Sequence, residues 1–463
     1  MSEYTYFTHG FIDALLSTVG CNQACLDHIF VNKKASCLVN PVAAHETELI
    51  IRPVEEGKRK RIAVVGAGPA GLSFATTASS RGHEVTLFDK DSEIGGQFNM
   101  AKLVPGKEEF HETLRYFKKQ LEISGVHVRL NTIVTPQDVK DFDSVVIATG
   151  VTPRKVNIPM NIITSDKVKC YSYIDVLKNK AVVGKSVAII GAGGIGYDVA
   201  DYITHDNHDY HSTAPLGVVD NTNVDNFLKE WGIDADVTNG GLMVSKKSEA
   251  TAAAAATTAA VAVSQHVPER KVYLLQRKKG KLGSTLGKTT GWIHRANMKK
   301  RSVEELSGCK YVEINDEGLV IEQSVGAAAG KTGKASISSS TAGGGAGGGA
   351  AATGSDKTKS TATTTTSTTK RRVLPVDTVI FCAGQEPLRD LHYPLTRTWQ
   401  HRSVFLIGGA YEAGELDAKR AIDQGTRLAA EIEDARTGEV YEAPIEMGHQ
   451  VMKFVESIVS NKK

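Results

Sequence analysis

The stretch Arg61–Lys90, RIAVVGAGPAGLSFATTASSRGHEVTLFDK, decides the fold of this chain. It opens with Ile62–Val65, an apolar run long enough for one buried strand. A glycine-rich turn and a small-residue segment typical of a helix follow, and a second apolar run, Glu84–Phe88, leads to Asp89. A strand, a turn, a helix, a second strand and a terminal acid are the parts of a βαβ unit that binds a dinucleotide. The sequence therefore predicts a dinucleotide-binding α/β domain.

The glycines of this turn have separate tasks. Gly66, Gly68 and Gly71 stand in G-x-G-x-x-G spacing. The first permits the tight turn, the second lets the backbone approach a pyrophosphate, and the third lets helix and strand pack closely. The start of the helix offers free N–H groups and the positive end of its dipole to the phosphates. Asp89 stands where a carboxylate accepts the hydroxyls of an adenosine ribose.

The same motif recurs later in the chain. Val187–Ile195 reads VAIIGAGGI, and Gly191, Gly193 and Gly196 repeat the spacing. An apolar strand precedes these glycines, and a helical segment continues from Tyr197. Two such units in one chain predict two nucleotides that face each other, one passing electrons to the other.

Two further segments share one sequence pattern. Asp143–Gly150 reads DSVVIATG and Asp377–Gly384 reads DTVIFCAG. Each is a buried strand followed by a small-residue turn, which lets the backbone pass close to a bound cofactor. Their order relative to the two glycine loops resembles that of flavin reductases with two dinucleotides. We therefore expect two Rossmann-like domains, an FAD domain with an NADPH domain inserted into it.

Composition excludes several classes of function. The chain has 463 residues, 41% of them hydrophobic, and a formal net charge of +3 that is spread along its length. Neither nucleic acid nor an anionic membrane is an expected partner. The sequence contains no run of about 18 apolar residues, so it predicts no membrane span. The N-terminus carries Glu3 and Asp13 and fits neither a secretory signal nor a good transit peptide, so we expect a cytoplasmic protein, with the mitochondrial matrix as the alternative.

Three of the six cysteines lie close together in the sequence. Cys21, Cys25 and Cys37 fall in GCNQACLDHIFVNKKASCLVNP. Closely spaced thiolates followed by a more distant one suit a soft metal or an iron–sulfur cluster. Three small buried thiols that only pack would give the same spacing, so the pattern leaves both interpretations open.

A longer set of motifs indicates a family. The chain resembles the C-terminal half of bacterial-type 2,4-dienoyl-CoA reductase, an iron–sulfur flavoprotein of the trimethylamine dehydrogenase group. The resemblance extends over nearly the whole chain, apart from its first residues and two low-complexity inserts. It is carried by GCNQACLDHIF, SCLVNP, HETE, PGKEEF, ETLRYFKK, IGGQFNMAK, GKTTGWIHR, CAGQEP and ELDAKRAIDQGTRLA.

The resemblance implies a 4Fe–4S cluster held by four cysteines, and this chain departs from that pattern. Cys21, Cys25 and Cys37 match three ligands, but Thr18 occupies the position of the first. A threonine hydroxyl is a poor iron ligand beside thiolate. A three-iron cluster, a labile four-iron cluster and no cluster all stay open. His45 could substitute as a ligand, but a histidine there also belongs to the family pattern and is expected to be structural.

The resemblance also assigns residues to the flavin. In EIGGQF, Gly96 leaves room for the backbone beside a ring or diphosphate, and Gln97 can hydrogen-bond it. In FLIGG, Gly408 and Gly409 approach the ribityl chain, and Gly409 stands where many flavoproteins carry an aspartate. Leu416–Leu428 is expected to form a helix whose positive end points at the flavin ring.

The second nucleotide unit ends in basic residues. Its next strand, Lys271–Gln276, is followed by Arg277 and Lys278. An acid there would favour the free 2′-hydroxyl of NAD, whereas basic residues suit the 2′-phosphate of NADP. Arg277 is the best candidate for a bidentate phosphate contact. The alternative is a solvated basic loop.

These assignments divide the chain into a cysteine-containing linker, a split FAD domain and an inserted NADPH domain. The NADPH domain carries both low-complexity inserts. The expected bounds are 1–60 for the linker, 61–160 with 376–463 for the FAD domain, 161–375 for the NADPH domain, and inserts near 250–263 and 326–370.

Function follows from the resemblance. In the family a TIM barrel of about 250 residues precedes the cysteines and holds FMN and the proton donors, whereas here only Met1–Ser17 precede position 18. No catalytic acid–base residue for dienoyl reduction is expected. We expect the electron-input half of a 2,4-dienoyl-CoA reductase in the β-oxidation of unsaturated acyl-CoAs. Electrons would pass from NADPH to FAD and an iron–sulfur cluster, with a separate FMN-binding barrel as partner. The alternatives are a stand-alone NADPH:acceptor reductase and a truncated, non-catalytic remnant.

Overall fold

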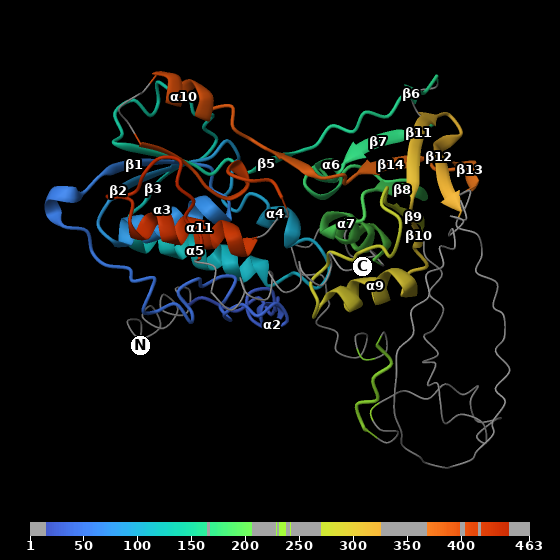
Figure 1. Cartoon of the computed structure of the whole chain (residues 1–463), viewed down its shortest axis with the longest axis horizontal. Helices are drawn as coiled ribbons and strands as arrows, with labels where there is room; N and C mark the ends of the chain where they lie inside the picture. The colour runs from blue at the N-terminus through green and yellow to red at the C-terminus, as the bar shows by residue number, and fades with distance from the viewer. Residues whose placement is uncertain are drawn as a thin grey trace, which may run out of the picture.

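The structure is a computed structural model in which the chain forms two α/β lobes side by side (Figure 1). It describes residues 15–163, 167–205, 228, 231–237, 241, 270–325, 368–398, 403–414 and 418–443. The expected insert near 250–263 and residues 326–367 of the second insert lie outside these ranges, as do the first fourteen and last twenty residues.

The first lobe is built on a parallel sheet of five strands in the order β16-β4-β1-β2-β3. Its middle strands are apolar on both faces because helices or loops cover both, as is usual for parallel sheets. The side chains of Ile62–Val65 and Val85–Phe88 are all buried. The strands are β1 Arg61–Val65, β2 Glu84–Phe88, β3 His127–Arg129, β4 Ser144–Ile147 and β16 Ser403–Leu406.

Three helices cover one face of this sheet and a fourth lies on the other. The first three are α3 (Pro69–Ser80), α5 (Phe110–Ser124) and α11 (Ala418–Ala430), and α10 (His392–Thr398) lies opposite (Figure 1). Phe117 and Leu121 of α5 are buried in the core between these helices and the sheet. The short helix α4, Phe98–Ala101, precedes α5.

The second lobe has the same plan. Its sheet is parallel with the order β10-β9-β8-β14-β7, and the turn after β8 carries the second glycine loop. The strands are β7 Lys169–Ser172, β8 Ser186–Ile190, β9 Lys271–Leu275, β10 Glu304–Leu306 and β14 Thr378–Phe381. The helices that share a core with it are α6 Tyr173–Leu177, α7 Gly194–Thr204 and α9 Gly291–Lys300.

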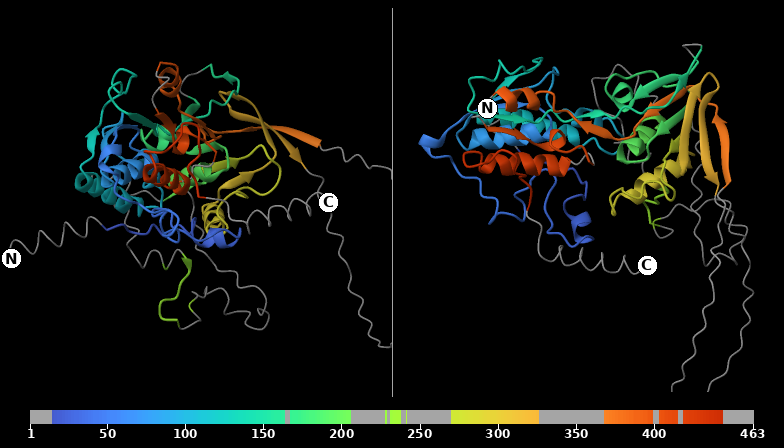
Figure 2. Two further views of the ribbon diagram at one scale, coloured as in Figure 1. Left: turned by 60° about the vertical axis from the view of Figure 1, so that its left-hand side comes forward. Right: turned by 45° about the horizontal axis from the view of Figure 1, so that its top comes forward.

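A second sheet, in which β11, β12 and β13 are antiparallel and β6 pairs parallel with β11, covers the other face of the second lobe, as the right-hand view of Figure 2 shows. The second low-complexity insert separates two strands of a hairpin, because β12 and β13 pair antiparallel. Residues 368–370, expected within the insert, belong to β13. The strands of this sheet are β6 Met160–Asn161, β11 Cys309–Asn315, β12 Gly318–Val325 and β13 Thr368–Leu374.

One detail is repeated in both lobes at the amino end of the central strand. Asp143 accepts a hydrogen bond from the backbone N–H of Arg61 at 2.7 Å. Asp377 accepts one from the N–H of Ser186 at 3.1 Å. Each acid precedes the strand that pairs with the glycine-loop strand, so the two sequence repeats are also structural repeats. The predicted α/β class with two Rossmann-like sheets is confirmed.

The chain crosses between the lobes at two adjacent strands, β5 (Val151–Pro153) and β15 (Gln385–Pro387), which pair antiparallel. The return to the first lobe therefore follows β14. Because β14 pairs with β8 and β7, the second sheet extends past the boundary expected at residue 375.

The cysteine-bearing segment runs beneath the helices of the first lobe toward the second (Figure 1). It contains α2, Leu26–Ile29, and a short 3₁₀ turn, Glu56–Lys58. Leu38 and Val39 pack with Phe98 and Ile422 of the first lobe. Asp27 accepts hydrogen bonds from the N–H and hydroxyl of Thr289 in the second lobe, at 2.9 and 2.8 Å. The segment thus contacts both lobes.

The close approach of α3 and α11 yields a stability prediction. A Cβ on Gly425 of α11 would overlap the carbonyl oxygen of Ala70 and lie 3.0 Å from the backbone nitrogen of Phe74. We expect Gly425→Ala to lower the free energy of unfolding by about 1–3 kcal/mol, because the helices must separate. Urea titration followed by circular dichroism measures this. Gly57→Ala, where nothing lies within 4 Å, is the control; equal midpoints for the two variants would contradict the prediction.

Candidate functional site

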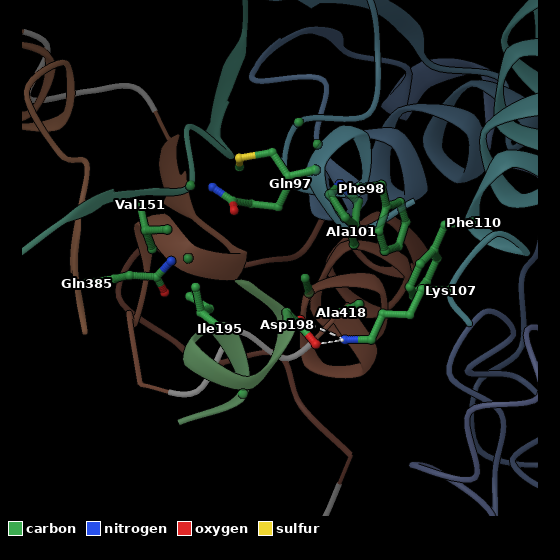
Figure 3. Close-up of a pocket in the computed structure, with 18 of the residues that line it drawn as sticks. Gln97, Phe98, Ala101, Lys107, Phe110, Val151, Ile195, Asp198, Gln385 and Ala418 are labelled. Atoms are coloured by element: carbon green, nitrogen blue, oxygen red, sulfur yellow. Dashed lines mark hydrogen bonds and ion pairs between the residues drawn. The ribbon is translucent and has the colours of Figure 1, made fainter. Parts of the chain in front are cut away.

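A cavity of about 1820 Å³ lies between the lobes, and both glycine loops line it. Gly66 and Gly68 contribute from the first lobe, and Gly191 and Gly193 from the second. Figure 3 shows side chains from both lobes around this space. The paired loops predicted from sequence therefore face a common cavity.

The first loop has the geometry that its glycines predict. Gly66 has a φ of +113°, and a Cβ there would overlap the carbonyl oxygen of Ala148, at the end of β4. A Cβ on Gly71 would overlap the carbonyl oxygen of Gly66. Gly68 differs, since nothing lies within 4 Å of its ideal Cβ position. Two glycines are thus required by the fold, and Gly68 leaves space at the start of α3 for an anionic ligand.

The second loop repeats this geometry. A Cβ on Gly191 would overlap the carbonyl oxygen of Cys382, after β14, and one on Gly196 would overlap that of Gly191. Gly193 again has nothing within 4 Å. Neither Gly68 nor Gly193 gives its helix a side-chain cap, so in both helices the first-turn N–H groups face a ligand-sized space. The residues present fit two dinucleotide pyrophosphates.

Asp89 lines the cavity at the end of β2. Its Oδ2 accepts the N–H of Ala67 at 2.6 Å, and its Oδ1 accepts the N–H of Asp91 at 2.8 Å. Each carboxylate oxygen has two lone-pair sites, so both can also accept a ribose hydroxyl. The residue therefore fixes the first glycine loop and is placed for the ribose contact that the sequence predicts.

The predicted flavin-contact residues gather at the first loop. An ideal Cβ on Gly96 would lie 3.0 Å from the Cα of Gly68, so this turn lies against the glycine loop. Gln97 lines the cavity, as Gly409 does. Gly408 has a φ of +60°, and its N–H donates to the Oε1 of Gln424 on α11 at 2.7 Å. α11 begins at Ala418, which also lines the cavity, and residues 416–417 of the predicted helix lie outside the described ranges.

Two ion pairs join the lobes at the cavity wall. Lys107 of the first lobe contacts Asp198 of α7 at 2.6 and 2.7 Å, the pair drawn with dashed lines in Figure 3. Lys178 of the second lobe contacts Asp91 of the first at 2.7 Å. Each lobe thus supplies one cation and one carboxylate.

A buried tyrosine lies beside the strands at which the chain crosses between the lobes. Tyr173, at the start of α6, is 2% exposed, and its hydroxyl accepts a hydrogen bond from the Nε2 of Gln385 at 2.8 Å. Burial raises the pKa of Tyr173 above the ordinary value for tyrosine, and hydrogen bonds from Gln385 and Gln97 oppose that shift. The phenol is neutral at physiological pH.

The second lobe places a polar cluster on the cavity wall. The Nη1 of Arg301 lies 2.9 Å from the Oδ1 of Asp201, and both side chains are nearly buried. Burial raises the pKa of Asp201, an effect that Arg301 opposes. Burial lowers the pKa of His294, so this imidazole is neutral at pH 7. The cluster connects α7 to α9 and shapes the wall.

The predicted 2′-phosphate residues lie apart from the cavity wall. Arg277 and Lys278 are exposed just after the end of β9, and neither is among the residues that line the cavity. The carboxyl end of this strand is where the fold places a nucleotide's adenosine ribose. Their role stays a prediction.

The three N-terminal cysteines do not form a ligand set as placed. Among the described residues, no three His, Cys, Asp or Glu side chains are arranged to hold a metal ion. Burial, and to a lesser extent Cys25 and Cys37, raise the pKa of Cys21, which disfavours its thiolate. Thr18 is exposed, and its Oγ1 accepts the N–H of Gly20 at 3.4 Å. These residues do not fit a four-cysteine iron–sulfur cluster, and we derive no electron step through one.

Sequence reasoning missed the residues that join the lobes. Lys107 and Gln385 stand inside PGKEEF and CAGQEP, motifs that carried the resemblance, so a signal for them existed. Asp198 and Tyr173 had no such signal, because their role depends on how the lobes meet. The structure also shows no described helix with the length and hydropathy needed to cross a bilayer.

Comparison with known proteins identifies the family. Residues 60–337 match the pyridine nucleotide-disulphide oxidoreductase family, which is more than half of the chain. The chain is 30% identical over 312 residues to a metal reductase of Desulforamulus reducens, a match that spans 66% of this chain and 41% of that protein. It is 33% identical over 196 residues to an NADH oxidase of Thermoanaerobacter brockii, or 40% of this chain and 29% of that one.

A solved structure has the same fold. The complex of 2-naphthoyl-CoA reductase with 2-naphthoyl-CoA overlays with a TM-score of 0.62 at 22% identity. The overlay spans 92% of this chain and 48% of the reductase. The chain thus spans less than half the length of each of these three proteins.

The open space at Gly68 predicts that fold and ligand binding can be separated. We expect Gly68→Val to leave the unfolding midpoint of the nucleotide-free protein unchanged, because nothing lies near its Cβ position. The valine would fill the pyrophosphate space, so the purified variant should lack FAD. Gly71→Ala is the contrast, since its Cβ overlaps a backbone carbonyl and should destabilise the fold. Wild-type flavin content in Gly68→Val would contradict this assignment.

The incomplete cysteine set predicts low iron content. We expect the purified chain to hold far less iron and acid-labile sulfide than a four-iron cluster requires, because Thr18 supplies no thiolate. Thr18→Cys should raise both after anaerobic reconstitution, and Ser17→Cys, one residue away, should not. A full four-iron signal in the unsubstituted chain, unchanged by Thr18→Cys, would show that another residue completes the site.

Proposed function

Because the chain belongs to the pyridine nucleotide-disulphide oxidoreductase family, we propose that it binds FAD at the first glycine loop and NADPH at the second, as an oxidoreductase. The carrying observation is that the two loops have the same backbone geometry and line one cavity. A cavity shared by two nucleotide loops allows two ring systems to meet away from bulk water.

The chain's own residues bind and orient the nucleotides. FAD held at the first loop supplies a two-electron acceptor for the hydride of a reduced nicotinamide. The N–H groups at the starts of α3 and α7 would bind the two pyrophosphates. Asp89 would bind the adenosine ribose of FAD, and the pair Lys107–Asp198 holds the facing lobes together. Gln97 and Gly409 would contact the flavin from the first lobe.

The proposed preference for NADPH rests on the positively charged side chains that follow β9. Arg277 and Lys278 follow Gln276 directly, with no acid beside them in the sequence. A guanidinium binds a phosphate bidentately, whereas NADH offers only hydroxyls at this position. One of the similar proteins is named an NADH oxidase, so NADH is the competing reductant in the test below.

The finer function is the electron-input half of a 2,4-dienoyl-CoA reductase. It is supported by the motifs that resemble that family, and the naphthoyl-CoA reductase supports only the fold. The partner would be a separate barrel domain or chain that takes electrons from the flavin. A stand-alone NADPH:acceptor reductase is the second candidate, favoured by the incomplete cysteine set around Thr18. Flavin reoxidation by ferricyanide but never by a dienoyl-CoA with added barrel protein would favour the second.

Stopped-flow reduction of the bound flavin tests the nucleotide assignment. NADPH should bleach the flavin absorbance faster than NADH at equal subsaturating concentration. Arg277→Ala should lower the apparent affinity for NADPH alone by a free energy of about 1.5–3 kcal/mol, the value of a hydrogen bond to a charged group. Lys310→Ala removes an exposed lysine of β11 and is the control. An unchanged NADPH preference in Arg277→Ala would remove this residue from the site.

A further inference from the structure

One side chain of the first lobe is buried in the core of the second. Met100 of α4 is 6% exposed and packs in the hydrophobic cluster that contains Tyr173, Val176 and Ala192. Among the described residues, every other member of this cluster comes from the second lobe. Figure 1 shows α4 between the two lobes. Met100 therefore joins the lobes through buried apolar packing.

A short stretch of hydrogen-bonded backbone connects Met100 to the first glycine loop. The N–H of Gly95 donates to the carbonyl of Ala67 at 2.8 Å. An ideal Cβ on Gly96 would lie 3.0 Å from the Cα of Gly68. The helix α4 begins two residues after Gly96 and carries Met100 in its first turn. A displacement of Met100 is therefore transmitted to the backbone that surrounds Gly68.

The core that receives Met100 includes the second glycine loop itself. Ala192 stands between Gly191 and Gly193 in that loop, and its side chain is buried in the same cluster as Met100. The strand before the loop, β8, and the helix after it, α7, also supply buried side chains to this cluster. The packing of Met100 therefore acts on the loop that would hold the second pyrophosphate.

The strands that cross between the lobes form a hinge. β5 and β15 pair over three residue pairs, and each strand follows a turn that lies against a glycine loop. Short connections between domains act as hinges, because a few backbone dihedrals absorb the whole motion. Domains that meet through polar contacts move relative to one another by default. A second point of attachment, away from the hinge, opposes rotation about it.

We propose that Met100 is a positioning residue: its packing in the second-lobe core fixes the angle of the lobes about the β5–β15 crossing, and so the distance over which hydride passes. This inference rests on the proposed function. Hydride transfer requires reacting atoms about 3–3.5 Å apart, and a displacement of about 1 Å lowers the rate about a hundredfold. A small rotation about the crossing strands is enough to displace the two nucleotides by that amount.

The ion pairs between the lobes do not replace this contact. Lys107–Asp198 and Lys178–Asp91 also join the lobes, but their side chains are 17–45% exposed. Partly exposed pairs of flexible side chains hold a loose geometry and are screened by salt. A side chain in a close-packed core is instead in contact on all sides. Met100 therefore constrains the lobes more tightly than the lysines do.

The experiment compares Met100→Ala with Met298→Ala. Met298 is buried in the same cluster, but it belongs to α9 of the second lobe and does not line the cavity. Both substitutions remove the same atoms from one core, and only Met100→Ala removes a contact between the lobes. Met100→Leu nearly conserves the side-chain volume and is the rescue variant. Met100→Val serves if Met100→Ala does not fold.

Two readouts separate positioning from direct contact with a nucleotide. Amide hydrogen exchange of the nucleotide-free proteins is the first, because it reports the loops when no nucleotide is bound. Stopped-flow reduction of the FAD-loaded proteins, giving a limiting rate and an apparent Kd for NADPH, is the second.

We expect faster exchange in peptides of both glycine loops, residues 66–72 and 191–198, in Met100→Ala. In Met298→Ala, faster exchange should be confined to the second lobe. The limiting rate of flavin reduction by Met100→Ala should fall about tenfold or more, with an apparent Kd within about twofold of wild type. Met298→Ala should keep the wild-type limiting rate, and Met100→Leu should recover most of it.

Three results would overturn the proposal. One is a limiting rate that Met100→Ala leaves unchanged or that Met298→Ala lowers equally. Another is faster exchange confined to the α4 peptide of Met100→Ala, which indicates local packing alone. The third is a wild-type protein that binds FAD but is reduced by neither NADPH nor NADH, which contradicts the proposed function and this inference with it. In the first two cases the proposed function stands.

Discussion

The architecture depends on one close approach, made twice. In each lobe a glycine with positive φ lies directly against the carbonyl of the neighbouring strand's turn, Gly66 against Ala148 and Gly191 against Cys382. No other residue type fits there, because a Cβ would overlap the carbonyl oxygen. The contact brings the glycine loop, the start of the following helix and the adjacent turn to one edge of the sheet. The nucleotide-binding sites proposed for the cavity lie along that edge of each sheet.

The lobes meet through polar contacts more than through a shared core. Met100 of α4 packs in the core of the second lobe, and the other described contacts at the junction include two ion pairs, the β5–β15 pairing and the buried hydrogen bond from Gln385 to Tyr173. Such an interface resembles transient protein–protein contacts, for which relative motion is the default. The buried contacts therefore have a specific task, which is to define one arrangement among those that a polar interface permits.

The sequence predicted what local pattern determines. Both glycine loops, their strands and the small-residue turns are where the motifs placed them, because each depends on backbone sterics within a short stretch. The pairing of β14 with β8, which carries the second sheet past residue 375, could not be predicted, because no local signal in the sequence reports it. The cysteines show the opposite limit. Their spacing suggested a ligand set, but Thr18 and the three thiols are not arranged as one.

The central claim is that two nucleotides meet in one cavity, each on its own glycine loop. A crystal structure of the FAD-loaded protein soaked with NADP⁺ tests it most directly. The account predicts one pyrophosphate at Gly66–Gly71 and the other at Gly191–Gly196, with both ring systems in the space between Gln97 and Gln385. Density for a nucleotide at one loop only, or two nucleotides whose rings point away from each other, would contradict it.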